Sequence, residues 1–158
     1  HLSVKERTMP EAPIVFGSDH AGLPLKSALL EILQQQGIAT EDQGTHTFDS
    51  CDYPVLASEV CQRIQQTRGL GVLVCGSGLG MSMVANRYQG IRAALCTNEY
   101  LARMARLHNN ANILCLGDRV LGIDLAQSIL ETFLNTPFEG GRHQRRVDLI
   151  DTLPQRGQ

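Results

Sequence analysis

A cysteine stands at the head of a glycine-rich turn in this chain. Residues 75–80 have the sequence CGSGLG and follow an apolar run that predicts a buried strand. Glycines at alternate positions let backbone N–H groups converge into an anion-binding nest where the next helix begins. The positive potential of such a nest favours the thiolate form of Cys75, which could then act as a base. The alternative is a tight strand-to-helix turn that holds an inert, buried cysteine.

Two nucleotide-binding motifs share glycines with this turn but differ from it in spacing. The dinucleotide motif is G-x-G-x-x-G after the first strand, with an acidic residue ending the next strand. Here the spacing is G-x-G-x-G, the turn follows the third predicted strand, and the following strand closes at Cys96. The phosphate loop of nucleotide hydrolases is excluded as well, because no Gly-Lys-Ser/Thr follows.

Asp19, His20 and His108 are candidate polar contacts for a ligand. Asp19 and His20 follow the first predicted strand and could hold a hydroxyl and a phosphate, although Asp19 could equally cap the next helix. His108 lies on the apolar face of a predicted helix near its C-terminus, where a histidine usually packs in the core or caps the helix. The helix dipole favours its charged form there, and a histidine can move protons at neutral pH.

Arginines near the C-terminus are spaced to hold an anion. Arg142 and Arg146 are one helical turn apart, so both project from one face and could clamp a phosphate. Arg119, after the fifth predicted strand, could join them. The alternative is a solvated basic tail. Because the formal net charge of the chain is −2, this local excess favours a small anionic ligand over nucleic acid.

Together these groups suit proton transfer on a phosphorylated sugar. Moving a carbonyl from C1 to C2 needs a base that takes the C2 proton and returns it at C1. It also needs donors for the developing oxyanion and an anchor for the phosphate. A cyclic sugar must open first, which needs a second acid–base group. This chemistry requires no metal, the sequence offers no convincing metal site, and we expect no cofactor.

The elements that must position these residues alternate between short β-branched runs and longer amphipathic stretches. Strands are predicted at 14–18, 38–42, 70–74, 91–95 and 113–116. Apolar stripes predict helices over 25–33, 57–64, 81–87, 101–108 and 126–134, and a basic segment covers 142–153. The alternation predicts an α/β fold: a single Rossmann-like, three-layer α/β/α domain with a five-stranded parallel sheet and a C-terminal helix. Ligands bind such sheets beyond the carboxyl ends of strands, so the polar candidates should cluster there.

Composition bounds the remaining possibilities. We place one domain at 13–153, with 1–12 as a disordered or tag-derived start and 154–158 as a tail. The net charge argues against nucleic-acid and membrane-surface partners. No apolar run approaches the ~20 residues of a membrane helix and no leader is recognisable, so we expect a cytoplasmic protein. The five cysteines are odd in number and lack C-x-x-C spacing, which is typical of reduced proteins rather than of disulfide frameworks or zinc sites.

Taken in order, the motifs resemble ribose-5-phosphate isomerase type B, a family that includes the galactose-6-phosphate isomerase subunits. They are FGSDHAG at 16–22, DYP at 52–54, CGSGLG at 75–80, AN at 85–86, GIRA at 90–93, HNNAN at 108–112 and GRHQRR at 141–146. The similarity runs over nearly the whole chain, from Ile14 to about Leu153. An ordered set of this kind is far more specific than any one motif.

The resemblance implies a Rossmann-like homodimer, with a tetramer as the open alternative, whose active sites lie at the subunit interface and take a small sugar phosphate. It implies Cys75 as the base, His108 as the acid–base group for ring opening, and Ser77 as a further catalytic residue. The implied sugar-binding residues are Asp19, His20, Tyr53, Gly76, Ser77, Gly78, Leu79, Gly80 and Asn109. The implied phosphate-binding residues are His20, Arg119, Arg142 and Arg146, some of them reaching across from the partner.

Two positions depart from patterns within the family. Ser77 stands where many cysteine-using members have threonine, and the hydroxyl is retained. Met81 stands where another branch has the glutamate that serves as its base. Activity should therefore depend strongly on Cys75.

Several alternatives stay open. The same chemistry could act on galactose 6-phosphate, allose 6-phosphate or a four-carbon ketose phosphate, although the galactose enzymes use two different subunits and this chain carries the whole residue set. A non-catalytic module that binds nucleotides or sugar phosphates would not depend on Cys75. A thiol redox protein needs a resolving cysteine nearby, and none is close in sequence.

Overall fold

The structure, a computed structural model, describes residues 12–153. The interpretations of 1–11 and 154–158 lie outside that range. The described part is built on one sheet of five parallel strands: β1 (Ile14–Ser18), β2 (Thr40–Asp42), β3 (Gly71–Cys75), β4 (Ala93–Leu95) and β5 (Ile113–Gly117). Their order across the sheet is β2-β1-β3-β5-β4. The predicted α/β fold is confirmed.

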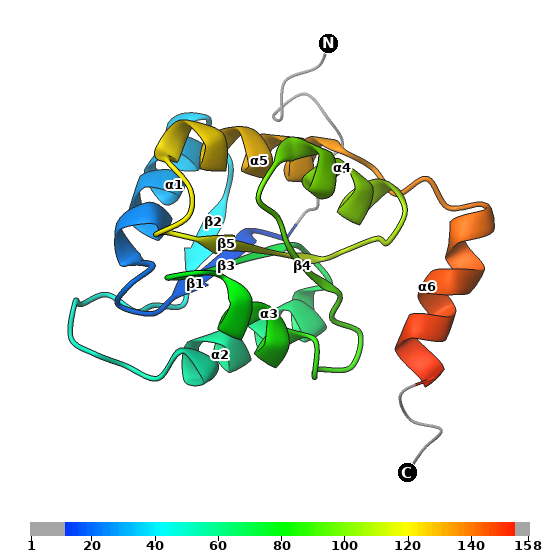
Figure 1. Ribbon diagram of the computed structural model, residues 1–158, viewed down its shortest axis with the longest axis horizontal. Coiled ribbons are helices and arrows are strands. Elements are labelled where there is room, and N and C mark those ends of the chain that lie inside the picture. The colour runs from blue at the N-terminus through cyan, green and yellow to red at the C-terminus, as the bar shows by residue number, and fades with distance from the viewer. Residues whose placement is uncertain (1–11, 154–158) are drawn as a thin grey trace.

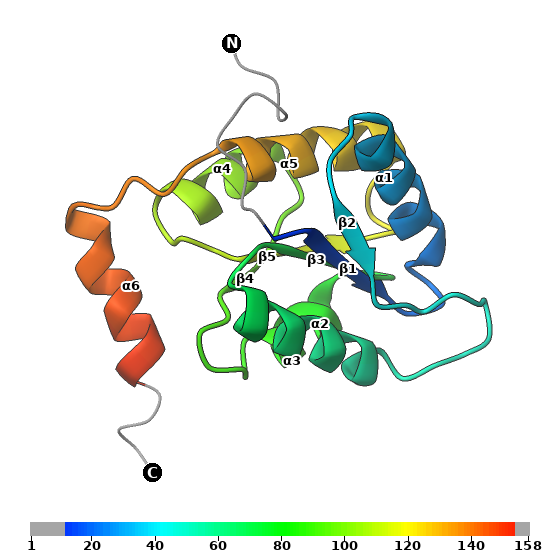
Figure 2. The same ribbon diagram turned by 180° about the vertical axis from the view of Figure 1, so that it is seen from behind.

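Helices cover both faces of the sheet, as Figures 1 and 2 show. The helices α1 (Leu23–Gln35), α4 (Glu99–Leu107) and α5 (Ile123–Asn135) lie on one face, and α2 (Tyr53–Thr67) and α3 (Leu79–Ala85) on the other. Successive strand residues point to opposite faces, so Phe16 joins a core with Leu29 and Phe133, whereas Val15 joins a second core with Met81. Within residues 12–153 no helix is long and apolar enough to cross a membrane.

Predicted element boundaries differ from the observed ones where local contacts compete with the regular structure. The edge strands β2 and β4 begin two residues later than predicted. Ile38 donates its N–H to Leu33 at the end of α1, and Ile91 donates to Tyr88 in a turn, so neither residue is available to the sheet. The helix α3 begins two residues earlier than predicted because Gly78 caps it within the glycine turn.

The last helix, α6 (Arg142–Thr152), stands apart from both layers, beyond the amino ends of the strands (Figures 1 and 2). An ion pair between Arg92 and Asp151, with a separation of 3.1 Å, ties it to the segment before β4. Leu149, Ile150 and Leu153 remain exposed on it. The helix therefore presents apolar side chains that its own chain does not bury.

The topology reverses between β1 and β3. The chain leaves β1 toward β2 at one edge of the sheet and leaves β3 toward β4 at the other edge. Helices on either side of such a switch point diverge, which leaves a crevice above the carboxyl ends of the two strands. Ser18 and Val74 are paired in register there, directly before Asp19 and Cys75.

Candidate active site

The thiol of Cys75 lies at the carboxyl end of β3, and the residue is 6% exposed. The backbone N–H of Gly78 donates to its sulfur across 3.1 Å. Gly78 has φ +81, a conformation that residues with side chains rarely adopt. The backbone N–H of Leu79 donates a hydrogen bond of 3.2 Å to the hydroxyl oxygen of Ser77, whose side chain is exposed. The turn therefore aims one backbone donor at the sulfur and presents a hydroxyl beside it.

Tyr53 packs against the same turn. A Cβ atom at Gly80 would lie 2.4 Å from the Tyr53 ring, so only glycine admits the ring at this distance. Tyr53 is the first residue of α2 and remains 38% exposed. Its ring therefore forms part of the wall of the crevice while still reaching solvent.

Asp19 is buried between the ends of β1 and β3. Its backbone N–H donates to the carbonyl of Val74, and its Oδ1 accepts the N–H of Gly22 at 2.9 Å. In the first turn of α1, the backbone N–H of Leu25 donates a hydrogen bond of 2.8 Å to Asp118 Oδ2. Asp19 thus stabilises the turn that leads into α1. This role is close to helix capping, which the sequence left open as the alternative to ligand binding. Asp118, which the sequence analysis missed, completes the cap from the end of β5.

His20 and Arg119 lie on the same edge of the sheet. Nδ1 of His20 accepts the N–H of Cys51 at 3.3 Å, so in the neutral ring the proton is on Nε2. The Arg119 guanidinium lies against the turn, because a Cβ atom at Gly76 would be 3.1 Å from its Nη1. The backbone N–H of Arg119 donates to Gly76 at 3.0 Å. The His20 imidazole, with its N–H at Nε2, and the Arg119 guanidinium thus lie beside the glycine turn that follows Cys75.

The structure does not bring His108 to this edge. His108 follows α4 as its C-cap, so it lies before β5, whereas Cys75 pairs with Gly117 at the end of that strand. The five residues of β5 separate the two ends by about 13 Å. Asn109 is exposed beside His108, and Arg142 and Arg146 are exposed on α6, also beyond the amino ends. One chain therefore holds two half-sets of the predicted site residues, at opposite ends of its sheet.

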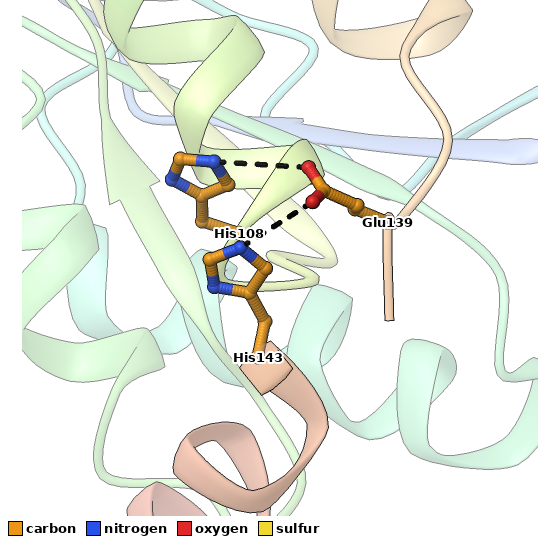
Figure 3. A group of neighbouring side chains, drawn as sticks. All are labelled: His108, Glu139 and His143. Carbon is orange, nitrogen blue, oxygen red and sulfur yellow. Dashed lines mark ion pairs between the residues drawn. The ribbon is translucent and has the colours of Figure 1, made fainter. Parts of the chain in front are cut away.

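His108 instead belongs to a cluster with Glu139 and His143, shown in Figure 3. The two imidazole rings stack with centroids 4.2 Å apart and an interplanar angle of 15°. Glu139 faces both: its carboxylate oxygens lie 3.9 Å from His108 Nε2 and 3.8 Å from His143 Nε2. Burial lowers the pKa of His143, and the nearby charges of His108, Arg142 and Arg146 lower it further, against the opposing effect of Glu139.

Sequence reasoning did not group these three residues. Glu139 precedes α6 by two glycines with positive φ, Gly140 and Gly141, so its spacing from His143 does not follow a helix. The neighbouring basic residues of the GRHQRR segment were the stronger signal. Only the contact of α6 with the end of α4 brings the cluster together.

Comparison with known proteins gives a consistent result. The profile of the Ribose/Galactose Isomerase family matches residues 14–150. Ribose-5-phosphate isomerase B of Escherichia coli K12 is 41% identical over 145 residues, which cover 90% of this chain and 97% of that protein.

Two solved structures have similar folds. A ribose 5-phosphate isomerase from Thermotoga maritima has 51% identity and a TM-score of 0.87, and the match covers 89% of this chain and 98% of that one. Ribose-5-phosphate isomerase B of Mycoplasma genitalium, solved with bound ribulose-5-phosphate, has 40% identity and a TM-score of 0.87. That match covers 91% of this chain and 97% of the Mycoplasma chain.

Proposed function

The chain belongs to the ribose/galactose isomerase family and is a sugar-phosphate isomerase, and on that premise we propose that it interconverts ribose 5-phosphate and ribulose 5-phosphate. The observation that carries the mechanism is the buried Cys75 sulfur with a backbone N–H aimed at it. A hydrogen bond from a backbone donor stabilises a thiolate more than a thiol, which prepares the sulfur to accept a proton. The absence of side chains at Gly76 and Gly80 lets Arg119 and Tyr53 lie close to this turn.

The proton moves between two neighbouring carbons of the open-chain sugar. The Cys75 thiolate removes the C2 proton of the aldose, and the electron pair shifts to the carbonyl oxygen to form an enediolate. The same thiol then returns the proton at C1, while the O2 proton moves to O1 and a carbonyl remains at C2. The Ser77 hydroxyl and backbone N–H groups of residues 76–80 supply donors for the two oxygens, apart from the Gly78 and Leu79 groups that bond within the turn. No metal ion takes part in these steps.

The phosphate and the ring oxygen need groups from a second copy of the chain. Within one chain, His20 Nε2 and Arg119 are on the cysteine side, whereas His108, Arg142 and Arg146 are at the far end of the sheet. A homodimer that places α6 and His108 of one copy over the Cys75 crevice of the other completes the set. The exposed apolar side chains of α6 fit such packing. His108 then protonates the ring oxygen O4 as the C1–O4 bond breaks, and the proton of the C1 hydroxyl passes to water, which leaves the aldehyde at C1.

The test is an interconversion assay on the purified full chain, with and without EDTA. Ribose 5-phosphate is compared with galactose 6-phosphate, allose 6-phosphate and a four-carbon ketose phosphate as substrates. We expect the highest kcat/KM with ribose 5-phosphate and no loss of rate with EDTA. A higher kcat/KM with a six- or four-carbon sugar would reassign the substrate. Loss of activity in EDTA that returns on adding a metal would refute the metal-independent mechanism.

A further inference from the structure

We propose that His108, Glu139 and His143 form an inhibitory binding site for a divalent transition-metal ion, with Zn²⁺ as the reference case (Figure 3). Two imidazoles and one carboxylate are a ligand set that zinc uses in proteins when a fourth position stays open to solvent or a ligand. The family resemblance gives none of these residues a metal-binding role. The site is defined by the convergence of three side chains from two segments.

The separations within the cluster favour a shared ion over direct hydrogen bonds. The carboxylate oxygens are 3.8 and 3.9 Å from the two Nε2 atoms, which is too long for a hydrogen bond. Two ligands on one zinc ion, with bonds of ~2.0–2.1 Å, lie about 3.3–3.6 Å apart. The three ligand atoms lie within 4.8 Å of one another. Because the two rings are stacked nearly parallel, they would have to turn out of the stack before all three atoms could bind one ion between them.

The state of His143 is the second, independent observation. The residue is 5% exposed, and its buried Nε2 has no hydrogen-bond partner among residues 12–153. Leaving such an atom unpaired costs stability, because burial removes its water without supplying a replacement. In Figure 3 this nitrogen points toward Glu139, the position that a metal ion between the two residues would satisfy. Arg142 and Arg146 on the same helix oppose a cation, so we expect binding weaker than that of a closed structural zinc site.

Zinc at this site would inhibit ring opening, and that consequence rests on the proposed function. A lone pair of His108 that is given to the metal can neither accept nor pass on a proton. Ribose 5-phosphate must open before isomerisation, whereas ribulose 5-phosphate is open-chain because its O5 carries the phosphate. The aldose formed from ribulose 5-phosphate closes its ring by the reverse of the same step, so zinc should lower kcat/KM in both directions. EDTA should restore the lost rate.

Zinc affinity is measured directly on the full chain, by competition with a chromophoric chelator, apart from any activity. We expect one Zn²⁺ per chain, with affinity reduced at least about tenfold in Glu139→Gln and His143→Ala. His46→Ala is the matched control, because His46 lies 3.7 Å from the Asp42 carboxylate without a second histidine, and it should bind zinc like the original chain. Glu139 is half exposed, so its variant should fold, which circular dichroism verifies.

The outcomes separate the site from the reaction. No stoichiometric binding, or binding that both variants retain, would overturn the site and leave the isomerase proposal intact. Binding that depends on Glu139 and His143 but leaves both reaction directions unaffected would support the ion site and overturn its inhibitory role. Inhibition in both directions that is absent in Glu139→Gln would support the whole proposal.

Discussion

The backbone N–H of Gly78 lies 3.1 Å from the sulfur of Cys75, and the positive φ of Gly78 is what aims it there. A donor fixed by the backbone stabilises negative charge on sulfur without any reorganisation during the reaction. We therefore expect Cys75→Ala and Cys75→Ser to lower kcat between about 10²- and 10⁴-fold, the usual contribution of a general base. The measurement is a steady-state assay in both directions.

The control for this experiment is Cys51→Ala. Cys51 contacts His20 through its backbone N–H, which alanine retains, and through its sulfur, which lies 3.9 Å from His20 Nδ1 and is lost in alanine. Because the backbone hydrogen bond remains, the variant should stay within a few-fold of the original activity. Serine at position 75 keeps a hydrogen-bonding oxygen of similar size but is a far weaker acid than a thiol. Full activity in Cys75→Ala would show that another group removes the proton.

The cysteines should differ sharply in reactivity with pH. Burial disfavours the thiolate and raises the pKa of Cys61 to about 12 and that of Cys96 to about 11, and it also raises the pKa of Cys115. At pH 8 roughly one Cys96 in a thousand is then a thiolate. Iodoacetamide at pH 8 should label Cys51 and Cys75 alone in the folded chain.

Mass spectrometry of the alkylated peptides checks this pattern. Cys96 should be labelled only as the pH approaches 11 and Cys61 only as it approaches 12, whereas Cys115 should be labelled only when urea unfolds the chain. Substrate should protect Cys75 from alkylation. Rapid labelling of Cys61 or Cys96 at pH 8 in the folded protein would contradict the burial argument.

A buried lysine anchors the loop beside the crevice. Lys26 has no exposed side-chain surface, and its Nζ donates to Asp42 at 2.7 Å and to the carbonyl of Thr45 at 2.6 Å. Lys26→Met keeps the volume but leaves both acceptors without this donor. Because Asp42 is partly exposed, we expect a loss of about 2–3 kcal/mol in the free energy of unfolding, below the full cost of breaking a buried pair. Chemical denaturation measures it.

The matched control is the partly exposed ion pair between Arg63 and Glu41, which involves no fully buried group. Arg63→Met should lower the free energy of unfolding much less than Lys26→Met does, since solvent screens that pair. The loop that Lys26 holds leads to Cys51 and its contact with His20, so the lysine variant should also raise KM. Equal losses of stability in the two variants would mean that burial does not strengthen the Lys26 pair.

The sequence predicted the sheet and the cysteine half of the site for one physical reason. In a parallel sheet, residues after different strands meet at one edge, so Asp19 and Cys75 could be placed together from order alone. The starts of the edge strands β2 and β4 were predicted two residues too early, because the N–H groups of Ile38 and Ile91 donate hydrogen bonds within local turns. Asp118 was missed because its contact with Leu25 spans 93 positions of sequence and leaves no local pattern.

The prediction that all polar candidates cluster at the carboxyl ends of the strands is wrong for the group around His108. His108 precedes its strand, so the same rule that gathers Asp19 and Cys75 sends it to the amino end. Glycine-rich chain between α5 and α6 sets the direction of α6, and no side-chain pattern encodes that direction. The cluster with Glu139 therefore emerged only from the folded chain.

The apolar side chains of α6 should be needed for assembly. Ile150 is 48% exposed and lies beside Leu149 and Leu153, which are exposed as well. Ile150→Glu places a charge in this patch and should yield monomers with little activity and unchanged secondary structure. Light scattering after size exclusion gives the mass, and Ser27→Glu on the exposed side of α1 is the control. A dimer that survives the Ile150 change with full activity would exclude this face as the interface.

Mixing two inactive variants tests the shared site most directly. If each site takes Cys75 from one copy and His108 from the other, a heterodimer of Cys75→Ala and His108→Ala contains one intact site and one doubly damaged site. Random pairing of equal amounts makes half of the dimers mixed, so the mixture should regain about a quarter of the original activity from two nearly inactive parents. Coexpression with two different tags isolates the mixed dimer, which should show about half of the activity per dimer. If both groups acted within one chain, every site would lack one of them and no activity would return. Restoration therefore depends on Cys75 and His108 lying beyond opposite ends of the sheet in one chain, and its absence would show that the sites do not form between copies.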